Sequence, residues 1–186
     1  MPIGVIILAA GLGRRMGCPK ALARVKGTSF LELVRGMLPD LCQVVIVTNK
    51  TVAAAFANAY FAQEMVMNPH PASGMSSSVL IGMQALPGCS NYLLFPVDHP
   101  LVDGKTIDLL IDATGKETAG MRIVPTFAGR RGHPIIVPGA VETIISKYPE
   151  KPLNELLHGI PIKEILVDDG AILKNLNHPE QLESET

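Results

Sequence analysis

The sequence predicts a three-layer αβα sandwich with a mainly parallel central sheet. Strand-like and helix-like segments alternate along residues 1–115, which is the pattern of successive β–α–β units. The strand-like segments are continuous apolar runs rich in β-branched residues, such as GVIILA from Gly4 to Ala9. Runs of this kind are expected in strands that helices cover on both faces.

The elements of this first half follow in order. After the strand over 4–9, a helix is predicted to start at Ser29, because Ser29 and Glu32 form a capping box, and to end at Pro39. The next strand is QVVIVT, from Gln43 to Thr48. The remaining predictions are a helix over 52–62, a strand over 64–67, a helix over 76–86, a strand over 91–97 and a helix over 106–113.

The pattern changes after residue 120. Two strand-like runs, 121–127 and 133–137, flank Gly129-Arg130-Arg131-Gly132, which predicts two strands joined by a turn. Helices over 141–147 and 153–157, a strand over 162–167 and a helix from Pro179 complete the prediction. Without an internal repeat or a linker, residues 1–186 are expected to form a single domain.

Composition excludes several classes of function. The formal net charge of the 186 residues is −1, so a broad basic face for nucleic acid is not expected. No apolar run approaches the roughly 18–20 residues that span a membrane, and the start lacks a signal peptide's basic region. We therefore expect a cytoplasmic protein with no membrane partner. The three cysteines form no CxxC motif, so reduced thiols are expected.

A glycine-rich, basic loop follows the first predicted strand, from Leu8 to Lys20. Gly11 and Gly13 allow the backbone to approach a ligand closely and to direct N–H groups at anionic oxygens. Three cations lie within seven residues: Arg14, Arg15 and Lys20. Because this loop follows the carboxyl end of a strand, where α/β sheets bind ligands, it indicates a triphosphate site. A surface loop with scattered basic residues is the alternative.

Two commoner glycine motifs do not fit this loop. A Walker A motif requires Gly-Lys followed by Ser or Thr, but Gly17 precedes Cys-Pro-Lys. A dinucleotide fingerprint requires a third glycine where Met16 stands, and an acid where the second strand ends in Thr48-Asn49. An NAD-binding protein is therefore a weaker hypothesis.

The segment LAAGLGRRMGCPKAL resembles the signature LAAGxSxRMGxxKxL of the MobA-like nucleotidyltransferases. It is closest to the branch that includes molybdenum cofactor cytidylyltransferase. The resemblance covers Ile3 to Leu182 and implies a Rossmann-like sheet of the nucleotide-diphospho-sugar transferase type. Gly13 stands where the family usually has Ser. Ala10 is typical of the cytidylyl branch, which implies CTP rather than GTP.

The resemblance also assigns roles within the loop. In the family, the loop backbone holds the nucleotide, and the Arg and Lys that match Arg15 and Lys20 bind its phosphates. The loop residues implied to bind nucleotide are Leu8, Ala9, Ala10, Gly11, Gly13 and Arg14.

A second segment, Asn68 to Ser78, follows a short strand and opens a helix. Its serines can cap backbone N–H groups, or the same helix end can hold a nucleotide. The segment resembles the family's NPxxxxGMxxSxxxG stretch, which implies that it lies against the base and sugar. The residues implied to bind are Asn68, Gly74, Ser76 and Ser78.

Asp98 directly follows the predicted strand over 91–97. A carboxylate at the carboxyl end of a buried strand is well placed to hold Mg²⁺, a cation that prefers oxygen ligands, although Asp98 as a turn or cap residue is the alternative. The segment Pro96 to Val102 resembles the family's CDQPxV, in which the Asp binds the metal.

The acceptor side of the resemblance is looser. Gly132-His133-Pro134 resembles the family's GHPxxF segment, so His133 is implied to line the acceptor site, with a structural role as the alternative. The family's C-terminal DxD acids are replaced by Asn175 and Asn177, and Asn177 is a candidate second metal ligand through its carbonyl oxygen. The cytidylyl branch's GDxGAR pattern is replaced by the sequence from Lys151 to Leu157.

These observations predict an enzyme that transfers a nucleotidyl group from a nucleoside triphosphate, with CTP favoured, to a phosphorylated small-molecule acceptor such as molybdopterin. Mg²⁺ is the expected cofactor, and Arg15, Lys20 and Asp98 are the expected catalytic residues. Residues 1–115 would bind the nucleotide and 116–186 the acceptor, and a molybdoenzyme is a candidate partner. The alternatives are the same chemistry on a sugar phosphate, and a non-catalytic nucleotide-binding accessory protein.

Overall fold

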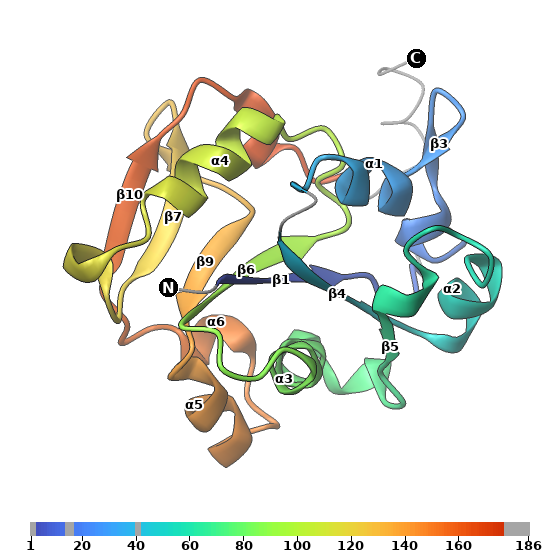
Figure 1. Ribbon diagram of the computed structural model, residues 1–186, viewed down its shortest axis with the longest axis horizontal. Coiled ribbons are helices and arrows are strands. Elements are labelled where there is room, and N and C mark those ends of the chain that lie inside the picture. Colours follow the sequence, from blue (N-terminus) through green and yellow to red (C-terminus); the bar gives the residue numbers. More distant parts are fainter. Residues whose placement is uncertain (1–2, 14–16, 40–41, 177–186) are drawn as a thin grey trace.

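The computed structural model describes residues 3–13, 17–39 and 42–176. Its centre is an eight-stranded, mainly parallel sheet with helices on both faces (Figure 1), which confirms the predicted three-layer fold. The strand order is β10-β7-β9-β6-β1-β4-β5, and β8 pairs with β7. The strands are β1 (Ile3–Leu8), β4 (Gln43–Thr48), β5 (Met65–Met67), β6 (Asn91–Pro96), β7 (Arg122–Phe127), β8 (Arg130–Arg131), β9 (Ile135–Pro138) and β10 (Ile162–Leu166).

Strand β1 lies at the centre of the parallel part. It pairs in parallel with β4 on one side and β6 on the other, and β4 pairs in parallel with β5. The carboxyl ends of these strands therefore share one edge of the sheet. The second half is mixed, because β9 runs antiparallel to both β6 and β7, while β10 is parallel to β7. A small hairpin of β2 (Arg24–Val25) and β3 (Thr28–Ser29) lies outside the sheet.

The two sheet faces bury two apolar clusters, because successive side chains of a strand point to opposite faces. Val5 and Ile7 of β1 pack with α1 and α4 on one face, and Ile6 packs with α3, α5 and α6 on the other. Figure 1 shows the same division of the helices. The helices are α1 (Phe30–Gly36), α2 (Lys50–Ala55), α3 (Met75–Ala85), α4 (Gly104–Asp112), α5 (Val141–Lys147) and α6 (Leu153–Leu156).

Helix α3 lies close against β1. A Cβ atom added at Gly82 would lie 2.5 Å from Ile6 Cγ2, so a larger residue there would push α3 away from the strand. This close contact matters because the segment from Gly74 to Ser78, at the start of α3, lies at the carboxyl edge of the sheet.

Most predicted elements are present, and the capping box is formed: Glu32 N donates to Ser29 Oγ (3.2 Å), and Ser29 N donates to Glu32 Oε2 (2.9 Å). The helix predicted over 52–62 is wrong, because α2 ends at Ala55. Phe56 and Phe61 are both buried, with ring centroids 5.5 Å apart. Side chains five residues apart do not share a helical face, so the chain turns to bury both rings.

The predicted turn between two strands is a tight hairpin of β7 with the two-residue β8, after which β9 crosses back between β7 and β6. The helix expected from Pro179 lies outside the described residues. In the described part of the chain, no helix has the length and apolar character needed to cross a bilayer.

Candidate active site

The loops after β1 and β6 leave the same edge of the sheet side by side. Leu8 is in register with Pro96, and Val97 N donates to Leu8 O (3.3 Å). The glycine-rich loop and Asp98 consequently face one cavity of about 240 Å³, which we call the edge cavity. It is lined by Leu8, Ala10, Gly11, Gly13, Lys20, Pro71, Gly74, Met75, Ser78, Pro96, Val97 and Asp98.

Lys20 and Asp98 form an ion pair across this cavity. Lys20 begins the short 3-10 turn η1 (Lys20–Leu22), and its Nζ lies 2.5 Å from Asp98 Oδ2. The side chains are 25% and 14% exposed, so both groups remain accessible to a ligand. Lys20 and Asp98 are 78 residues apart in the sequence, and the fold brings their side chains into contact.

One side-chain oxygen of Asp98 is not used by the ion pair with Lys20. Its second oxygen, Oδ1, is buried and has no hydrogen-bond partner among the described residues, and His99 Nε2 is 3.8 Å from it. A buried carboxylate oxygen without a partner is unfavourable by itself. The same oxygen is a suitable ligand for a hard cation such as Mg²⁺. The residues present therefore fit a divalent cation at Asp98.

The described protein residues do not form a complete metal site, because they include no group of three His, Cys, Asp or Glu side chains arranged around a common point. This agrees with the chemistry of Mg²⁺, which commonly binds one or two carboxylates and completes its shell with substrate phosphates and water. A cation at Asp98 would accordingly arrive with a phosphorylated ligand.

Two histidines lie behind Asp98 with their ring centroids 5.2 Å apart, His99 from the β6 side and His133 from the segment before β9. Burial lowers the pKa of His99 to about 4, although the negative charge of Asp98 opposes this shift. Burial also lowers the pKa of His133 against the same opposing charge. Both imidazoles are therefore neutral at pH 7 and add no positive charge that would repel a cation from Asp98.

The glycine-rich loop has a backbone that only glycine permits at position 13. Gly13 has φ +59°, and an added Cβ would lie 1.8 Å from the carbonyl oxygen of Cys18. This contact explains why glycine replaces the serine that is usual in the family.

Asn49, at the position where NAD-binding proteins carry an acid, supports the loop. It is 4% exposed, its Nδ2 donates to Ala10 O (3.1 Å), and its Oδ1 accepts from Val52 N (3.0 Å). This role was not predicted from the sequence, although an asparagine directly before a helix is a typical N-cap.

Three residues predicted to bind nucleotide do not line the edge cavity. Ala9 is buried in the core beside β4, to which its N–H donates. Asn68 is 2% exposed, and its side chain is engaged within its own loop: Nδ2 donates to Ser77 Oγ and Ser78 Oγ, and Oδ1 accepts from His70 N. Asn68 therefore shapes the loop that presents Gly74 and Ser78.

Ser76 is the third residue that does not line the edge cavity. Its hydroxyl donates to Lys151 O (2.7 Å), and its side chain lines a second, larger cavity instead. One turn of helix α3 carries Ser76 and Ser78 on different sides, which the shared serine motif did not distinguish.

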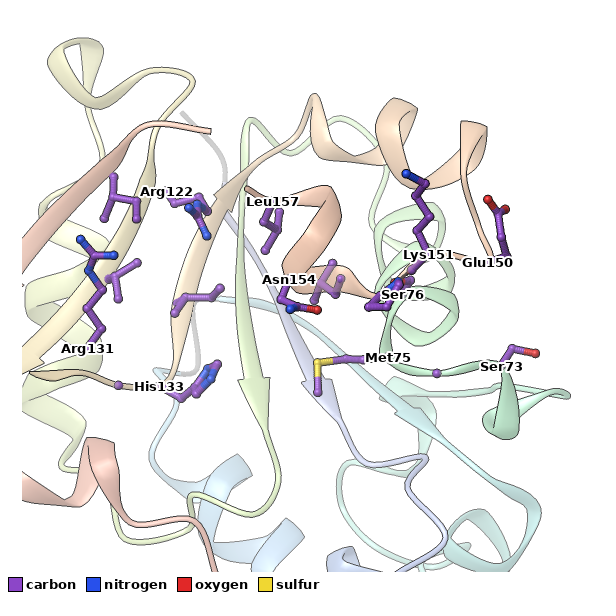
Figure 2. Close-up of a pocket in the computed structure, with 17 residues that line it drawn as sticks. Ser73, Met75, Ser76, Arg122, Arg131, His133, Glu150, Lys151, Asn154 and Leu157 are labelled. Carbon is purple, nitrogen blue, oxygen red and sulfur yellow. Dashed lines mark hydrogen bonds between the residues drawn. The ribbon is translucent and has the colours of Figure 1, made fainter. Parts of the chain in front are cut away.

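This second cavity, which we call the groove, has a volume of about 630 Å³ and adjoins the edge cavity at Gly74 and Met75. Figure 2 shows its side chains arriving from β7, β8, the start of α3 and the segment around α6. His133 lines it, as the resemblance implies for the acceptor side. The groove also contains Arg122, Arg131 and Lys151, which no motif indicated because they are far apart in the sequence.

The C-terminal segment returns to this edge of the sheet. Leu176 N donates to Asp98 O (2.9 Å). Asp169 Oδ2 accepts from Asp103 N and Thr106 Oγ1, which ties the segment to the start of α4. Of the predicted site residues, Arg14, Arg15 and Asn177 lie outside the described residues.

The fold and the edge cavity together define a Rossmann-like α/β protein with a glycine-lined cavity beside a strand-end carboxylate. The chain belongs to the MobA-like NTP transferase domain family, whose model matches residues 5–160.

A relative in sequence matches about two thirds of this chain. A protein of Bacillus cereus named "Probable molybdenum cofactor guanylyltransferase" is 29% identical over 130 residues, which are 68% of this chain and 62% of that protein. The chain thus matches less than two thirds of the length of this relative.

Two solved structures share the fold over nearly their whole lengths. Rv0371c of Mycobacterium tuberculosis superposes with a TM-score of 0.78 at 21% identity, covering 100% of this chain and 97% of that one. The same protein has also been solved in complex with manganese. Molybdopterin-guanine dinucleotide biosynthesis protein A of Archaeoglobus fulgidus superposes with a TM-score of 0.75 at 17% identity, covering 98% and 96%.

Proposed function

We propose that this protein is a nucleotidyltransferase that passes the nucleotidyl group of CTP to a phosphorylated acceptor such as molybdopterin and releases pyrophosphate. The observation that carries the proposal is the Lys20–Asp98 ion pair, which faces the glycine-rich loop in a cavity that opens onto a second, larger groove. Two adjoining sites are what a transfer between two substrates requires. Residues 1–115 would supply most of the first site and residues 116–186 most of the second.

In this proposal the ion pair is exchanged when the triphosphate binds. Lys20 Nζ would bind the phosphate oxygens in place of Asp98, and Asp98, whose Oδ1 has no hydrogen-bond partner among the described residues, would hold Mg²⁺. Mg²⁺ supplies positive charge that stabilises the charge developing on the phosphates. Arg15 adds a second cation from the loop. Asn177 is proposed as a further ligand, since the preceding residue, Leu176, is hydrogen-bonded to Asp98 O.

The protein side chains then position rather than react. A phosphate oxygen of the acceptor attacks the α-phosphorus, and the bond from the α-phosphorus to the bridging oxygen of pyrophosphate breaks. No side-chain nucleophile is needed, because orientation and electrostatic stabilisation lower the barrier. His133, neutral at pH 7 and placed in the groove beside Asp98, would orient the acceptor phosphate as a hydrogen-bond donor.

The choice of CTP is supported by Ala10. This residue is 4% exposed and lines the edge cavity, and alanine at this position is what the resemblance gives for the cytidylyl branch. GTP is the second candidate, because the curated relative is named as a guanylyltransferase.

The test compares CTP, GTP, UTP and ATP, each with and without Mg²⁺, by thermal shift and by pyrophosphate release with molybdopterin. A ligand that binds only the folded state raises its melting temperature. We expect the largest Mg²⁺-dependent shift and the fastest release with CTP. A larger shift and faster release with GTP would show that GTP, and not CTP, is the preferred nucleotide. Binding without pyrophosphate release from any acceptor, including sugar phosphates, would instead indicate a non-catalytic nucleotide-binding protein.

A further inference from the structure

The groove has a cationic end that the reaction at Asp98 does not use. Arg122, Val124 and Thr126 alternate along β7 and so share one sheet face. Arg131 is in register with Thr126, and Ile162 of β10 with Arg122. Arg122 is thus four residues along the strand from the level of Thr126, or roughly 13 Å at about 3.3 Å per residue.

The surface between the two ends is apolar. The apolar residues that line the groove are Val124, Ile135 and Ile162 from the sheet and Leu153 and Leu157 from the α6 segment. Figure 2 shows Leu157 and Asn154 facing the two arginines across the groove. A bound molecule therefore meets polar groups mainly at the ends of the groove.

The charge at the far end is incompletely neutralised. Arg131 is paired with Glu164 of β10, with Nη2 2.6 Å from Oε1. Arg122 Nε donates to Ile160 O (3.3 Å), and no carboxylate among the described residues forms an ion pair with Arg122. Partial burial and the like charge of Arg131 both lower the pKa of Arg122, but an arginine remains charged at pH 7.

We propose that Arg122 is a subsite that binds an electron-rich group at the far end of the acceptor. The acceptor is then a two-ended molecule, with the attacking phosphate at Lys20 and Asp98, an apolar or flat body along the apolar residues, and a second electron-rich group at Arg122. This inference rests on the proposed function, because it identifies the groove as the acceptor site. Arg122 would therefore determine which acceptor binds and would have no effect on nucleotide binding.

The experiment measures steady-state pyrophosphate release with Mg²⁺, CTP and molybdopterin, and molybdopterin binding by calorimetry without nucleotide. The test variant is Arg122→Met, which keeps the aliphatic stem and removes the charge, and Arg122→Lys restores the charge without the planar fork. Arg130→Met is the matched control, because Arg130 is an exposed neighbour on β8 that does not line the groove.

A charge-assisted contact of this kind is expected to change affinity by about tenfold or more. Arg122→Met should raise the KM and the Kd for molybdopterin by that factor and leave the KM for CTP and the melting temperature within normal scatter. Arg122→Lys should recover part of the loss, and Arg130→Met should resemble the wild type. An unchanged acceptor KM and Kd in Arg122→Met, or an equal rise in the KM for CTP, would overturn the subsite.

The two proposals fail in different ways. If the wild type binds molybdopterin but releases no pyrophosphate, and Arg122→Met weakens that binding, transfer activity is refuted and the subsite stands. If the wild type turns over and Arg122→Met is indifferent, the subsite is refuted and the transfer stands. If the wild type does not bind molybdopterin, the two-ended acceptor site is refuted as stated for this ligand.

Discussion

The edge cavity and the groove are adjoining sites built in different ways. The edge cavity is made largely of backbone and small side chains from contiguous loops, and its charged members, Lys20 and Asp98, are already paired. The groove is made of side chains dispersed over β7, β8, α3 and α6, several of them apolar, and its Arg122 forms no ion pair with a carboxylate of the residues that the structure describes. The first surface suits a common ligand such as a triphosphate, and the second suits a ligand of particular shape.

The two sites differ in how readily substitutions can change their ligand specificity. Backbone N–H groups at a loop bind phosphates through geometry that many sequences can supply, provided that glycines are retained. Side chains on a sheet face can be exchanged one at a time without disturbing the backbone. We therefore expect substitutions in the edge cavity to lower the rate with every acceptor. Substitutions in the groove should change only the KM for the acceptor.

The largest effect is expected at Asp98. Asp98→Asn removes the negative charge proposed to hold Mg²⁺, so kcat/KM should fall by about 10³-fold or more while the fold is kept. Asp108→Asn, on the exposed side of α4, is the control. The measurement is pyrophosphate release against Mg²⁺ concentration. Wild-type Mg²⁺ dependence in Asp98→Asn would refute the metal assignment.

The histidines where the two sites meet predict how stability depends on pH. The pKa of His99 falls from 6.5 in the unfolded chain to about 4 in the folded protein, so the unfolded state binds more protons between these values. The stabilisation is complete above pH 6.5 and is lost as pH falls toward 4, by up to about 3 kcal/mol. His99→Gln, which does not titrate, should have a flatter profile in urea unfolding between pH 8 and 4. Equal slopes would contradict this account.

Gly13→Ser tests whether the loop backbone itself is the nucleotide site. The added side chain would be forced against the carbonyl of Cys18, so the loop must change its path. We expect the KM for CTP to rise by about tenfold, with little change in melting temperature because the loop is largely exposed.

Gly17→Ala is the matched control for this change. Gly17 also has a positive φ, of +72°, but no atom lies within 4 Å of an added Cβ. Comparing Gly17→Ala with Gly13→Ser therefore distinguishes the effect of a steric clash from that of an unfavourable positive φ. If both variants bind CTP as the wild type does, the loop conformation at Gly13 is not required.

The smallest effect is expected at Ser76, whose hydrogen bond to Lys151 O ties helix α3 to the segment before α6 in the wall of the groove. Ser76→Ala should lower the free energy of unfolding by about 1 kcal/mol. It should also raise the acceptor KM a few-fold without changing the nucleotide KM. Ser146→Ala, at an exposed serine of α5 that lines neither cavity, is the control. A change confined to the nucleotide KM would return Ser76 to the edge cavity.

The elements that could be predicted from sequence are those with strong local signals. The capping box at Ser29 and the apolar runs of β1 and β4 gave the correct element types and nearly the correct limits. The helix over 52–62 was wrong because exposed alanines favour helix locally, while the burial of Phe56 and Phe61 depends on the rest of the fold. Tertiary packing outweighed helix propensity at that point.

The same division applies to the site. The sequence alone determined that glycines, a lysine and an aspartate follow buried strands, since neighbouring residues in a loop must stay together. The folded chain places Ser76 in the groove, holds the Asn68 side chain within its own loop, and puts Arg122 and Arg131 on one sheet face, and none of this could be predicted from the sequence. The physical reason is that strand pairing and helix packing bring together residues far apart in the chain, and no local pattern records that arrangement.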